Sequence, residues 1–461
     1  MRLITKLVAP LSMKINKFEN ISIYIFCCLF SFLIFYLVNY IYFNNNLLID
    51  LLGLTVAIFW VGLLIIFMLS GVNKAASRNY VGFLFVLGLF HLGIPLGGFF
   101  EYGNDYYDKN LSRWYYSEYT IKSFIVVYLF LVGYAISNIF PVKSLNFKSG
   151  FFCFNNEYNY KLIFILYLSL VLLWIFFVRF ISGVSNYTLY AEGNASSNIL
   201  NAFFVYGNNL IGFLFVLLCL NKKYAKNSLI TMFFWAIFAL PIGLRGEVFF
   251  PIVMSIPFLI NNNIIRLNIF KLTSMVIIIL TGLSAIFIYR HGEAVEGTEI
   301  NPLATIIEMG GSLRPVYESI KWIEGKELNF FYGETYWAPI ERVITKIIPY
   351  IDRLPANEDM RLMNVVILNK AGPYGFSIIG ESFINFSYLG TVFIGLICGL
   401  FLKSFDLSTS KNNFLILALV FALFFHIRQS FVGGFAVFSF SIIFCLTLKL
   451  IFSLLEGKYK K

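Results

Sequence analysis

The sequence predicts an all-α polytopic membrane protein with about twelve transmembrane helices and one large loop between helices 9 and 10. Of its 461 residues, 59% are hydrophobic and only 13% are charged, whereas a soluble domain has roughly 45–50% apolar and about 25% charged residues. The mean hydropathy is +0.79. Apolar runs of about 20 residues, the length that a helix needs to cross a bilayer, recur along almost the whole chain.

Apolar runs bounded by polar clusters predict the individual spans. They cover about residues 21–43, 47–69, 81–100, 121–140, 161–180, 202–220, 229–242, 248–260, 272–289, 387–402, 414–425 and 431–450. The first run follows a basic start like that of a signal peptide. However, it is too long for a signal h-region of about 7–15 residues and has no small-residue cleavage site, so we expect it to be retained.

These spans divide the chain into three parts. Residues 1–289 would hold transmembrane helices 1–9, residues 290–380 would form the large outer loop, and residues 381–461 would hold helices 10–12 and a cytoplasmic tail. If the N-terminus is inside, the inner segments hold 17 Lys and 3 Arg of the chain's 35 basic residues. Because short cytoplasmic loops are enriched in Lys and Arg, both termini are predicted to be cytoplasmic.

The basic residues on the outer side differ in kind. By this topology, 9 Arg and only 6 Lys lie outside or at outer helix ends. Guanidinium is a planar fork suited to bidentate contacts with phosphate or carboxylate, whereas the ammonium group of lysine is a point charge. The outer arginines are therefore candidates for binding an anionic ligand. The alternative is that they pair with outer glutamates or reach lipid headgroups.

The segment GLRGE (243–247) places Arg245 and Glu247 between two apolar runs that are each too short to cross a bilayer alone. Basic residues on both sides of the pair of runs favour a hairpin over a single crossing. Its tip would lie below the outer surface, where irregular backbone must line a cavity or be buried in protein. Short membrane segments interrupted by Gly or Pro indicate a binding site. A structural Arg245–Glu247 ion pair is the alternative.

A second short hairpin is predicted near the C-terminus. The run 414–425 is followed by His426, Arg428 and Gln429 before the last span. Arg428 would therefore point outward from a hairpin tip, as Arg245 does, and Arg290 would close the ninth span on the same side. A lone His at a helix end, such as His426, is more often structural.

The large outer loop has its own sequence patterns. Residues 336–351 carry isoleucine and valine at helical spacing with charges between them, which predicts an amphipathic helix that could lie on the outer leaflet. Five aromatics could stack on sugars or anchor the loop at the interface; they are Tyr317, Trp322, Tyr332, Tyr336 and Trp337. The loop ends in GPYGFSIIGESFINFSYLG (372–390), in which glycines and a lone Glu381 lead into the tenth span.

Taken together, the predicted spans, the late outer loop, the GLRGE hairpin and the segment 372–390 resemble the Wzy-type O-antigen polysaccharide polymerases. The resemblance covers most of residues 150–450. Members of this class use arginines of periplasmic loops, with an Arg-x10-Gly pattern that occurs here as Arg314…Gly325 and Arg361…Gly372.

The resemblance implies an activity, a substrate and a location. The substrate would be a polyprenyl-pyrophosphate-linked oligosaccharide, polymerised at the periplasmic face of the bacterial inner membrane when a sugar hydroxyl displaces the pyrophosphate. The enzyme would be a metal-independent membrane glycosyltransferase without a cofactor, in contact with membrane lipid and with a chain-length regulator protein as a further partner; no nucleic acid is expected. Candidate bases are Glu381 and Glu247, and candidate pyrophosphate or glycan ligands are Arg245, Arg290, Arg314, Arg361 and Arg428.

Three other functions compete with polymerisation. A flippase for the same lipid-linked unit should carry charges along the middle of its helices and show two similar halves, and the sequence shows neither. O-antigen ligases carry a His near the final Gly-rich segment of the loop, and none occurs at 350–390. A non-enzymatic scaffold would not require arginine enrichment on one side.

Overall fold

The structure of this chain is a computed structural model. It describes residues 21–38, 46–69, 71–100, 114–145, 152–154, 157–178, 206–271, 274, 281–282, 302–347, 354–372, 374–408 and 413–459. Within these residues the regular structure is helical, apart from one isolated bridge between Cys153 and Asn413.

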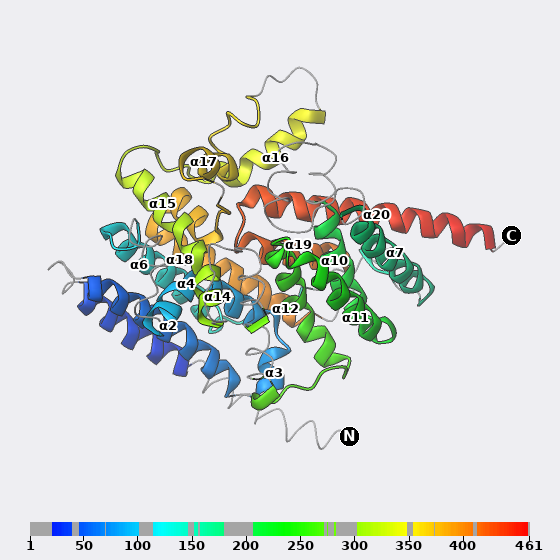
Figure 1. The fold of residues 1–461 in the computed structure, drawn as a ribbon, viewed down its shortest axis with the longest axis horizontal. Helices are drawn as coiled ribbons and strands as arrows, with labels where there is room; N and C mark the ends of the chain where they lie inside the picture. Colours follow the sequence, from blue (N-terminus) through cyan, green and yellow to red (C-terminus); the bar gives the residue numbers. More distant parts are fainter. Residues whose placement is uncertain are drawn as a thin grey trace. The chain divides into compact units, whose positions relative to one another are not determined.

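A first helix spans Ile21–Val38. The others, labelled in Figure 1, are α2 (Asn46–Met68), α3 (Val72–Ala76), α4 (Asn79–Phe100), α6 (Glu118–Ile136), α7 (Glu157–Phe176), α10 (Asn208–Cys219), α11 (Lys222–Ala239), α12 (Arg245–Asn261), α14 (Pro302–Met309), α15 (Leu313–Glu324), α16 (Glu334–Ile347), α17 (Met363–Lys370), α18 (Ile378–Asp406), α19 (Phe414–His426) and α20 (Phe431–Tyr459), with a short 3-10 helix η5 (Gly310–Ser312).

The helices confirm the prediction of an all-helical, multi-pass membrane protein. Among the described residues, seven helices are long and apolar enough to cross a membrane, and α10 and α19 are shorter apolar helices. The predicted span 272–289 lies almost wholly outside the described residues, so the number twelve stays a prediction. The predicted hairpin runs 229–242 and 248–260 correspond to α11 and α12, which are joined by a five-residue turn.

The chain forms two compact units, each built from separated segments. The first, unit 1, holds residues 1–143, 306–406 and 427–432, and the second, unit 2, holds residues 144–305, 407–426 and 433–461. The three-part division made from the sequence follows membrane topology and remains a prediction.

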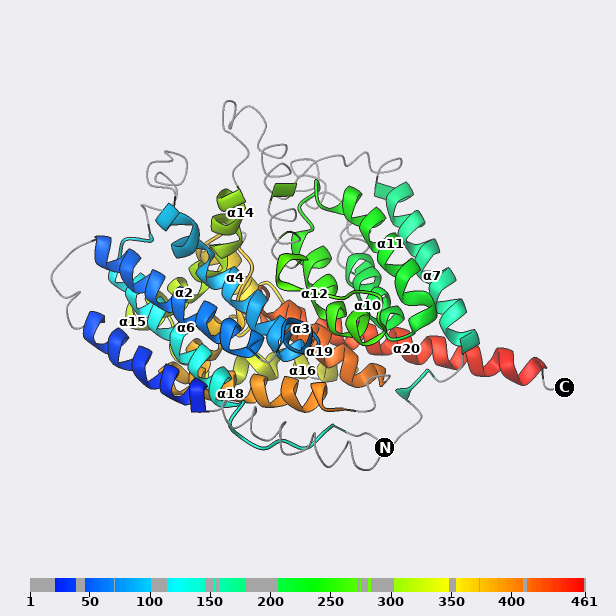
Figure 2. The ribbon, with the colours of Figure 1, turned by 90° about the horizontal axis from the view of Figure 1, so that it is seen from below.

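Unit 1 is built around the helices α2, α4, α6 and α18, which lie side by side (Figures 1 and 2). The closest pair is α6 and α18. A Cβ atom at Gly133 of α6 would collide with the backbone of Val392, and one at Gly395 of α18 would collide with the backbone of Phe130. Glycine at these two positions lets the two backbones approach, as small residues do at helix interfaces in membranes.

Part of the predicted outer loop is packed into unit 1. Gly93 of α4 and Gly310 of η5 lie back to back, because a Cβ atom on either residue would meet the backbone of the other segment. The helix α15 that follows packs against both α6 and α18. Residues 306–324 therefore contribute to the core of unit 1.

Unit 2 is centred on α10, whose residues are all buried. The helices α7, α11, α12 and α19 contact it. The fully buried indoles of Trp174 and Trp235 meet edge to face, with ring centroids 5.6 Å apart, and join α7 to α11.

Polar contacts connect segments that the lysine pattern assigns to the same side. Lys223 at the start of α11 pairs with Glu157 at the start of α7, and the Asp406 carboxylate accepts the backbone N–H of Asn79 at 2.9 Å. Both contacts join predicted inner ends. On the predicted outer side, Lys122 pairs with Glu324. The contacts agree with the predicted pairing of helix ends, while the absolute orientation stays a prediction.

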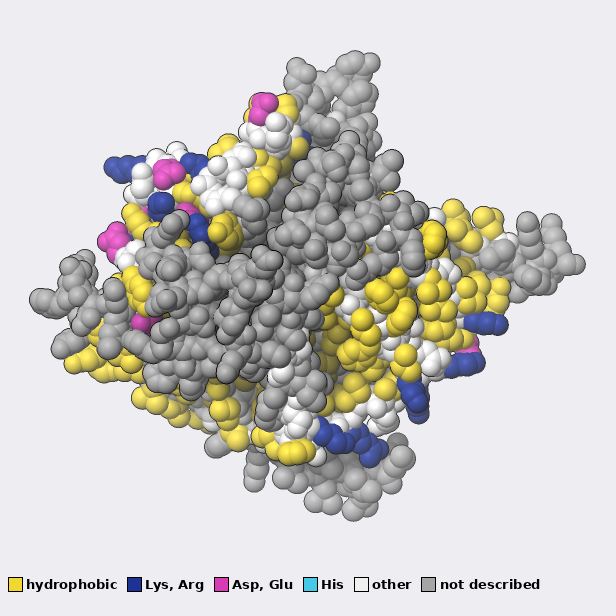
Figure 3. Space-filling view, viewed as in Figure 1, with side chains coloured by type: hydrophobic (Ala, Val, Ile, Leu, Met, Phe, Trp, Pro, Cys, Tyr) yellow, Lys and Arg dark blue, Asp and Glu magenta, His cyan; other side chains and the backbone are white. Residues whose placement is uncertain are grey.

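The described surface also suits a membrane. Hydrophobic side chains cover the described faces of α7 and α20 in Figure 3, and charged side chains gather over α15 and α17. Exposed side chains of α7 include Ile165, Leu172 and Leu173. Large apolar surfaces of this kind are stable only against lipid or another protein.

Candidate active site

The helix α18 is broken at Ser387. This residue has φ 61° and ψ −162°, so the helix consists of a short first half, residues 378–386, and a long second half. That backbone conformation is essentially confined to glycine and costs a serine about 1–3 kcal/mol. The break lies at the residue where the sequence placed the start of the tenth span. Discontinuous membrane helices of this kind recur at binding sites.

The first half of α18 is capped by Ser377. The Ser377 hydroxyl oxygen accepts hydrogen bonds from the backbone N–H groups of Ile379 (3.1 Å) and Gly380 (3.2 Å). Its oxygen also lies 2.9 Å from Nε2 of His91 in α4, and Nδ1 of His91 lies 2.8 Å from the carbonyl oxygen of Leu87. The carbonyl can only accept, so His91 carries its proton on Nδ1 and Ser377 donates to Nε2. This buried chain of hydrogen bonds holds the half-helix against α4.

The other end of the half-helix is held by the loop that leads into α16. The amide nitrogen of Asn385 donates to the Thr335 hydroxyl (2.6 Å) and to the Glu381 carbonyl (2.8 Å), and its amide oxygen accepts the N–H of Gly333 (2.9 Å). The N–H of Tyr332 donates to the carbonyl of Asn385 at 3.1 Å. Gly333, with φ 96°, supplies the turn.

The half-helix carries Glu381, which is fully buried. Its Oε2 accepts the backbone N–H of Phe431, the first residue of α20, at 2.6 Å. A buried carboxylate is costly unless it is hydrogen-bonded or paired. The contact therefore fixes the turn between α19 and α20, residues 427–430, against the start of α18.

The same turn carries Arg428, which is exposed. Its guanidinium carbon lies 5.7 Å from the ring centroid of Phe90 in α4, and its carbonyl oxygen lies so close to Gly375 that a Cβ there would collide with it. Two predicted site residues, Glu381 and Arg428, are thus brought together in unit 1. We refer to His91, Ser377, Glu381, Arg428 and Phe431 as the half-helix cluster.

Tyr336 of α16 adds an aromatic wall beside this cluster. Its ring meets that of Phe431 edge to face at 5.2 Å and stacks on Phe386 at 6.2 Å. Burial, with the nearby Glu381 carboxylate as a second cause, raises the pKa of the Tyr336 phenol well above its usual value. Tyr336 therefore stays protonated and neutral at physiological pH.

Arg314 lies at the start of α15 in an aromatic setting. Its guanidinium carbon is 4.3 Å from the ring centroid of Tyr374 and 5.9 Å from that of Trp114, and its Nε is 3.5 Å from a carboxylate oxygen of Glu318. The residue is therefore joined to Tyr374, which lies three residues before Ser377 of the half-helix cluster.

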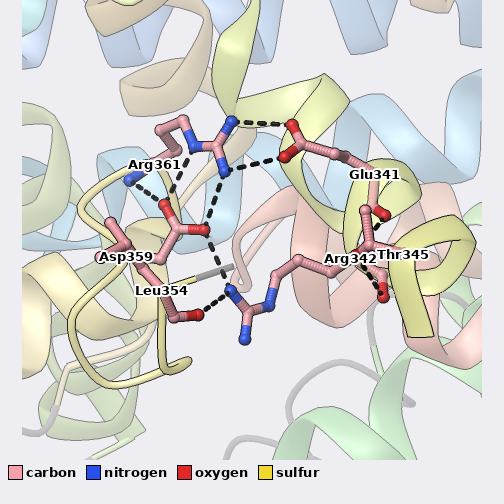
Figure 4. Close-up of polar contacts among 6 residues, drawn as sticks. All are labelled: Glu341, Arg342, Thr345, Leu354, Asp359 and Arg361. Atoms are coloured by element: carbon pink, nitrogen blue, oxygen red, sulfur yellow. Dashed lines mark hydrogen bonds and ion pairs between the residues drawn. The ribbon is translucent and has the colours of Figure 1, made fainter. Parts of the chain in front are cut away.

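Arg361 is held by two carboxylates (Figure 4). It donates to Asp359 from Nε (3.0 Å) and from one terminal nitrogen (3.1 Å), and to Glu341 of α16 at 2.8 Å and 3.4 Å. Arg342 donates to the same Asp359 at 3.1 Å and to the carbonyl of Leu354 at 3.0 Å. These contacts raise the pKa of Arg361. Burial favours a higher pKa for Asp359, but the hydrogen bonds from Arg361 and Arg342 outweigh burial, so its pKa is lowered.

Arg245 and Glu247 belong to unit 2. They lie in the first turn of α12, after the turn in which Gly243 has φ 99°. Arg245 is buried, with 5% of its surface exposed, and Glu247 is half-buried. Because the two units are not placed relative to one another, the structure does not relate this pair to the half-helix cluster. Arg290, the remaining candidate, lies outside the described residues.

Comparison with known proteins identifies the chain's relatives. The model of one protein family, O-antigen polysaccharide polymerase Wzy, matches residues 22–460. The chain belongs to the Wzy family of O-antigen polysaccharide polymerases. Protein CapE of Staphylococcus aureus is 25% identical over 376 residues, which cover 79% of this chain and 82% of that protein. No solved structure matches. The resemblance seen in the sequence is confirmed, and with it the function as a polymerase of lipid-linked repeat units.

The Arg-x10-Gly spacing of this Wzy polymerase has a simple structural basis. Arg314 is the second residue of α15, and Gly325 directly follows that helix. Arg361 precedes α17 by two residues, and Gly372, with φ 109°, follows its end. Each spacing therefore spans one short helix of two to three turns, with the arginine at its start and the glycine at its end.

Sequence reasoning missed several members of the half-helix cluster. His91 is 286 residues from Ser377, and the backbone N–H of Phe431 carries no side-chain signal. Ser377 could have been found, because a serine directly before the apolar run IIGESF is a typical helix N-cap. Of the five loop aromatics, Tyr317 and Trp322 are buried, whereas Tyr332 and Trp337 are exposed.

Proposed function

We propose that this Wzy polymerase joins repeat units at the half-helix cluster, on the periplasmic side of the bacterial inner membrane, with both termini in the cytoplasm. The substrate is a polyprenyl-pyrophosphate-linked oligosaccharide. A hydroxyl oxygen of the incoming unit bonds to the anomeric carbon of the growing chain, and the bond from that carbon to the pyrophosphate oxygen breaks. The hydroxyl proton needs an acceptor, and the departing pyrophosphate needs positive charge.

Glu381 is the proposed proton acceptor. The observation that carries this assignment is its contact with Phe431, since that contact brings a carboxylate to the turn that contains Arg428. A base and a cation must be held in fixed positions relative to each other for this reaction. His91 and Ser377 at one end of the half-helix, and Asn385 with Thr335 at the other, supply that rigidity.

Arg428 is the proposed pyrophosphate ligand within unit 1. It is exposed, and it lies three residues from the N–H that Glu381 binds. Arg314, whose guanidinium stacks on Tyr374, suits contacts to the glycan or to the second phosphate, because arginine combines planar hydrogen bonding with stacking.

Three further arginines remain candidates for the same anionic groups. Arg245 and Arg290 are proposed to bind pyrophosphate, with Glu247 as a second candidate base beside Arg245. Arg361 could reach a phosphate only by releasing Asp359 or Glu341, so its contribution to binding would require a rearrangement of the network in Figure 4.

The reaction is proposed to need no metal, because arginines can stabilise the leaving pyrophosphate. Within the described part of the chain there is no group of three His, Cys, Asp or Glu side chains that could hold a metal ion. Polymerisation by purified protein that persists in excess EDTA would support this; loss that is restored by added Mg²⁺ would contradict it. A chain-length regulator protein is proposed as a partner, to be tested by co-purification.

The proposed function is tested by the glycan profile of a deletion strain. In the deletion strain, we expect single-repeat lipopolysaccharide in place of polymer. The wild-type gene should restore full-length polymer. Arg428→Ala should fail to restore it at normal membrane abundance, while Arg266→Ala, an exposed arginine of a predicted inner loop, should restore it fully. Loss of all repeats from the lipopolysaccharide of the deletion strain would show that the protein is a flippase or a ligase instead.

A further inference from the structure

The helix α16 leaves a row of apolar side chains uncovered. Trp337, Ile340 and Ile344 recur at i, i+3 and i+7 and so lie on one face of the helix. Trp337 and Ile344 are exposed, as are the neighbouring Val343 and Tyr332. By length and composition α16 is not among the helices that could cross a membrane. It is amphipathic, with one apolar face that no described element covers.

The other side of α16 is fixed to the protein. Thr335 and Ala338 are fully buried. Glu341 and Arg342 are tied to Asp359 and Arg361 by the network of Figure 4. These contacts hold Glu341 and Arg342 toward the protein and set the rotation of the helix.

The exposed face of α16 continues onto an exposed apolar stripe of α18. The helix α18 as a whole is long and apolar enough to cross a membrane, and its second half exposes Leu389, Phe393 and Ile397 in one stripe. Phe386 continues this stripe toward the half-helix and stacks on Tyr336 of α16. A Cβ atom at Gly333 would lie 3.3 Å from the same Phe386 ring. The start of α16 therefore meets the apolar stripe of α18 at Phe386.

We infer that α16 is an interfacial helix whose face of Tyr332, Trp337, Ile340, Val343 and Ile344 inserts into the outer leaflet, in contact with phospholipid acyl chains next to the headgroups. Two observations select lipid as the occupant: the continuity with the membrane-spanning stripe of α18, and the exposed Trp and Tyr, which favour the membrane–water boundary. Helices of this kind bury their apolar face about 5–10 Å below the headgroups. The helix thereby sets the depth of the neighbouring half-helix. The contact with lipid is independent of the proposed chemistry, whereas the choice of the outer leaflet rests on the proposed topology.

Tryptophan fluorescence gives a direct test on the full-length protein. Trp337 is 55% exposed, whereas the other five tryptophans, at positions 60, 114, 174, 235 and 322, are at most 8% exposed. Wild type and Trp337→Phe are reconstituted into vesicles, and the difference between their emission spectra isolates Trp337. Phosphatidylcholine brominated at carbons near the headgroup should quench this component at least about twofold and more than deep bromination does, while aqueous iodide has little effect. Quenching by iodide and not by brominated lipid would overturn the inference.

A labelled variant tests whether a second copy of the chain or another protein, instead of lipid, covers this face of α16. In a background without Cys28 and Cys153, Ile344→Cys and, as a matched control, the exposed Asn329→Cys are labelled with an environment-sensitive dye. The dye at position 344 is expected to show blue-shifted emission that brominated lipid quenches. The dye at position 329 is expected to emit as it does in water. Emission at 344 that is shielded from both brominated lipid and iodide would show protein on this face and would refute the lipid contact.

Discussion

The carboxylate of Glu381 and the backbone N–H of Phe431 are joined by a hydrogen bond of 2.6 Å, although the two residues are 50 positions apart. The bond connects the broken start of α18 to the first residue of α20. It has two possible functions: the carboxylate caps the N-terminus of α20, or it also accepts the proton of the reacting hydroxyl. A capping carboxylate is stabilised by the positive end of the helix dipole. The two functions respond differently to substitution.

The substitution Glu381→Gln distinguishes the capping function of Glu381 from its function as a base. Glutamine keeps an oxygen that can accept the Phe431 N–H but cannot take a proton at neutral pH. If Glu381 is the base, polymerisation should fall by about 10²- to 10⁴-fold at unchanged membrane abundance, measured as repeat-unit consumption by purified protein. The matched control is Glu358→Gln, an exposed carboxylate of the outer segment, which should be fully active. Normal activity of Glu381→Gln would leave capping as its role.

Arg245→Lys tests the pyrophosphate role in unit 2. Lysine keeps the charge but loses the bidentate fork, so activity should drop by about 10- to 100-fold, the loss expected for one charge-assisted hydrogen bond. Polymer length and membrane abundance are measured for the Lys and Ala variants and for Arg245→Glu combined with Glu247→Arg. Full polymerisation by the exchanged pair would show a structural ion pair.

The ion pairs around Asp359 should make the stability of the segment 326–372 depend on pH in the acid range. The folded-state pKa of Asp359 is lowered, so its stabilising effect is complete above the ordinary carboxyl pKa of about 3.9 and is lost as the pH falls through the folded value. Pepsin cleavage of the segment 326–372 should therefore rise only below about pH 4. Asp359→Asn should be cleaved readily at pH 5 as well. Equal cleavage of both proteins at all pH values would show that the network does not hold this segment.

Ser387→Gly should stabilise the protein. The backbone at Ser387 costs a serine about 1–3 kcal/mol, and the extra chain entropy of glycine removes about 0.5–1 kcal/mol of the gain. Thermal unfolding in detergent should occur at higher temperature than for wild type. Ser382→Gly, a buried helical serine of the same half-helix, is the control and should unfold earlier. A lower unfolding temperature for Ser387→Gly would mean that the break is not strained.

Reporter fusions test the orientation. Fusions after Asn227 should be cytoplasmic, because Lys222, Lys223 and Lys226 in the first turns of α11 place this end inside. Fusions after Glu327, three residues beyond the end of α15, should be periplasmic. A cytoplasmic signal at Glu327 would contradict the predicted topology and move the half-helix cluster to the wrong side for periplasmic polymerisation.

The sequence by itself determined the class of protein, most of the helices and the family. Helix positions follow from the length and hydropathy of each run, which are local properties, and the two short hairpins follow from glycine and proline at α11–α12 and from the polar turn after α19. The sequence could single out Glu381 because a lone carboxylate in an apolar run is costly wherever it lies; its role in the reaction stays a prediction.

Only the tertiary structure decided which residues share a site. The contacts of His91 with Ser377 and of Glu381 with the Phe431 backbone join segments 286 and 50 residues apart, and no local pattern encodes such distances. The same holds for Arg361: its spacing to Gly372 matches a family pattern, but its two carboxylate partners become visible only when α16 and the chain before α17 are folded together. Hydropathy specifies what is buried, whereas packing specifies what each buried group contacts.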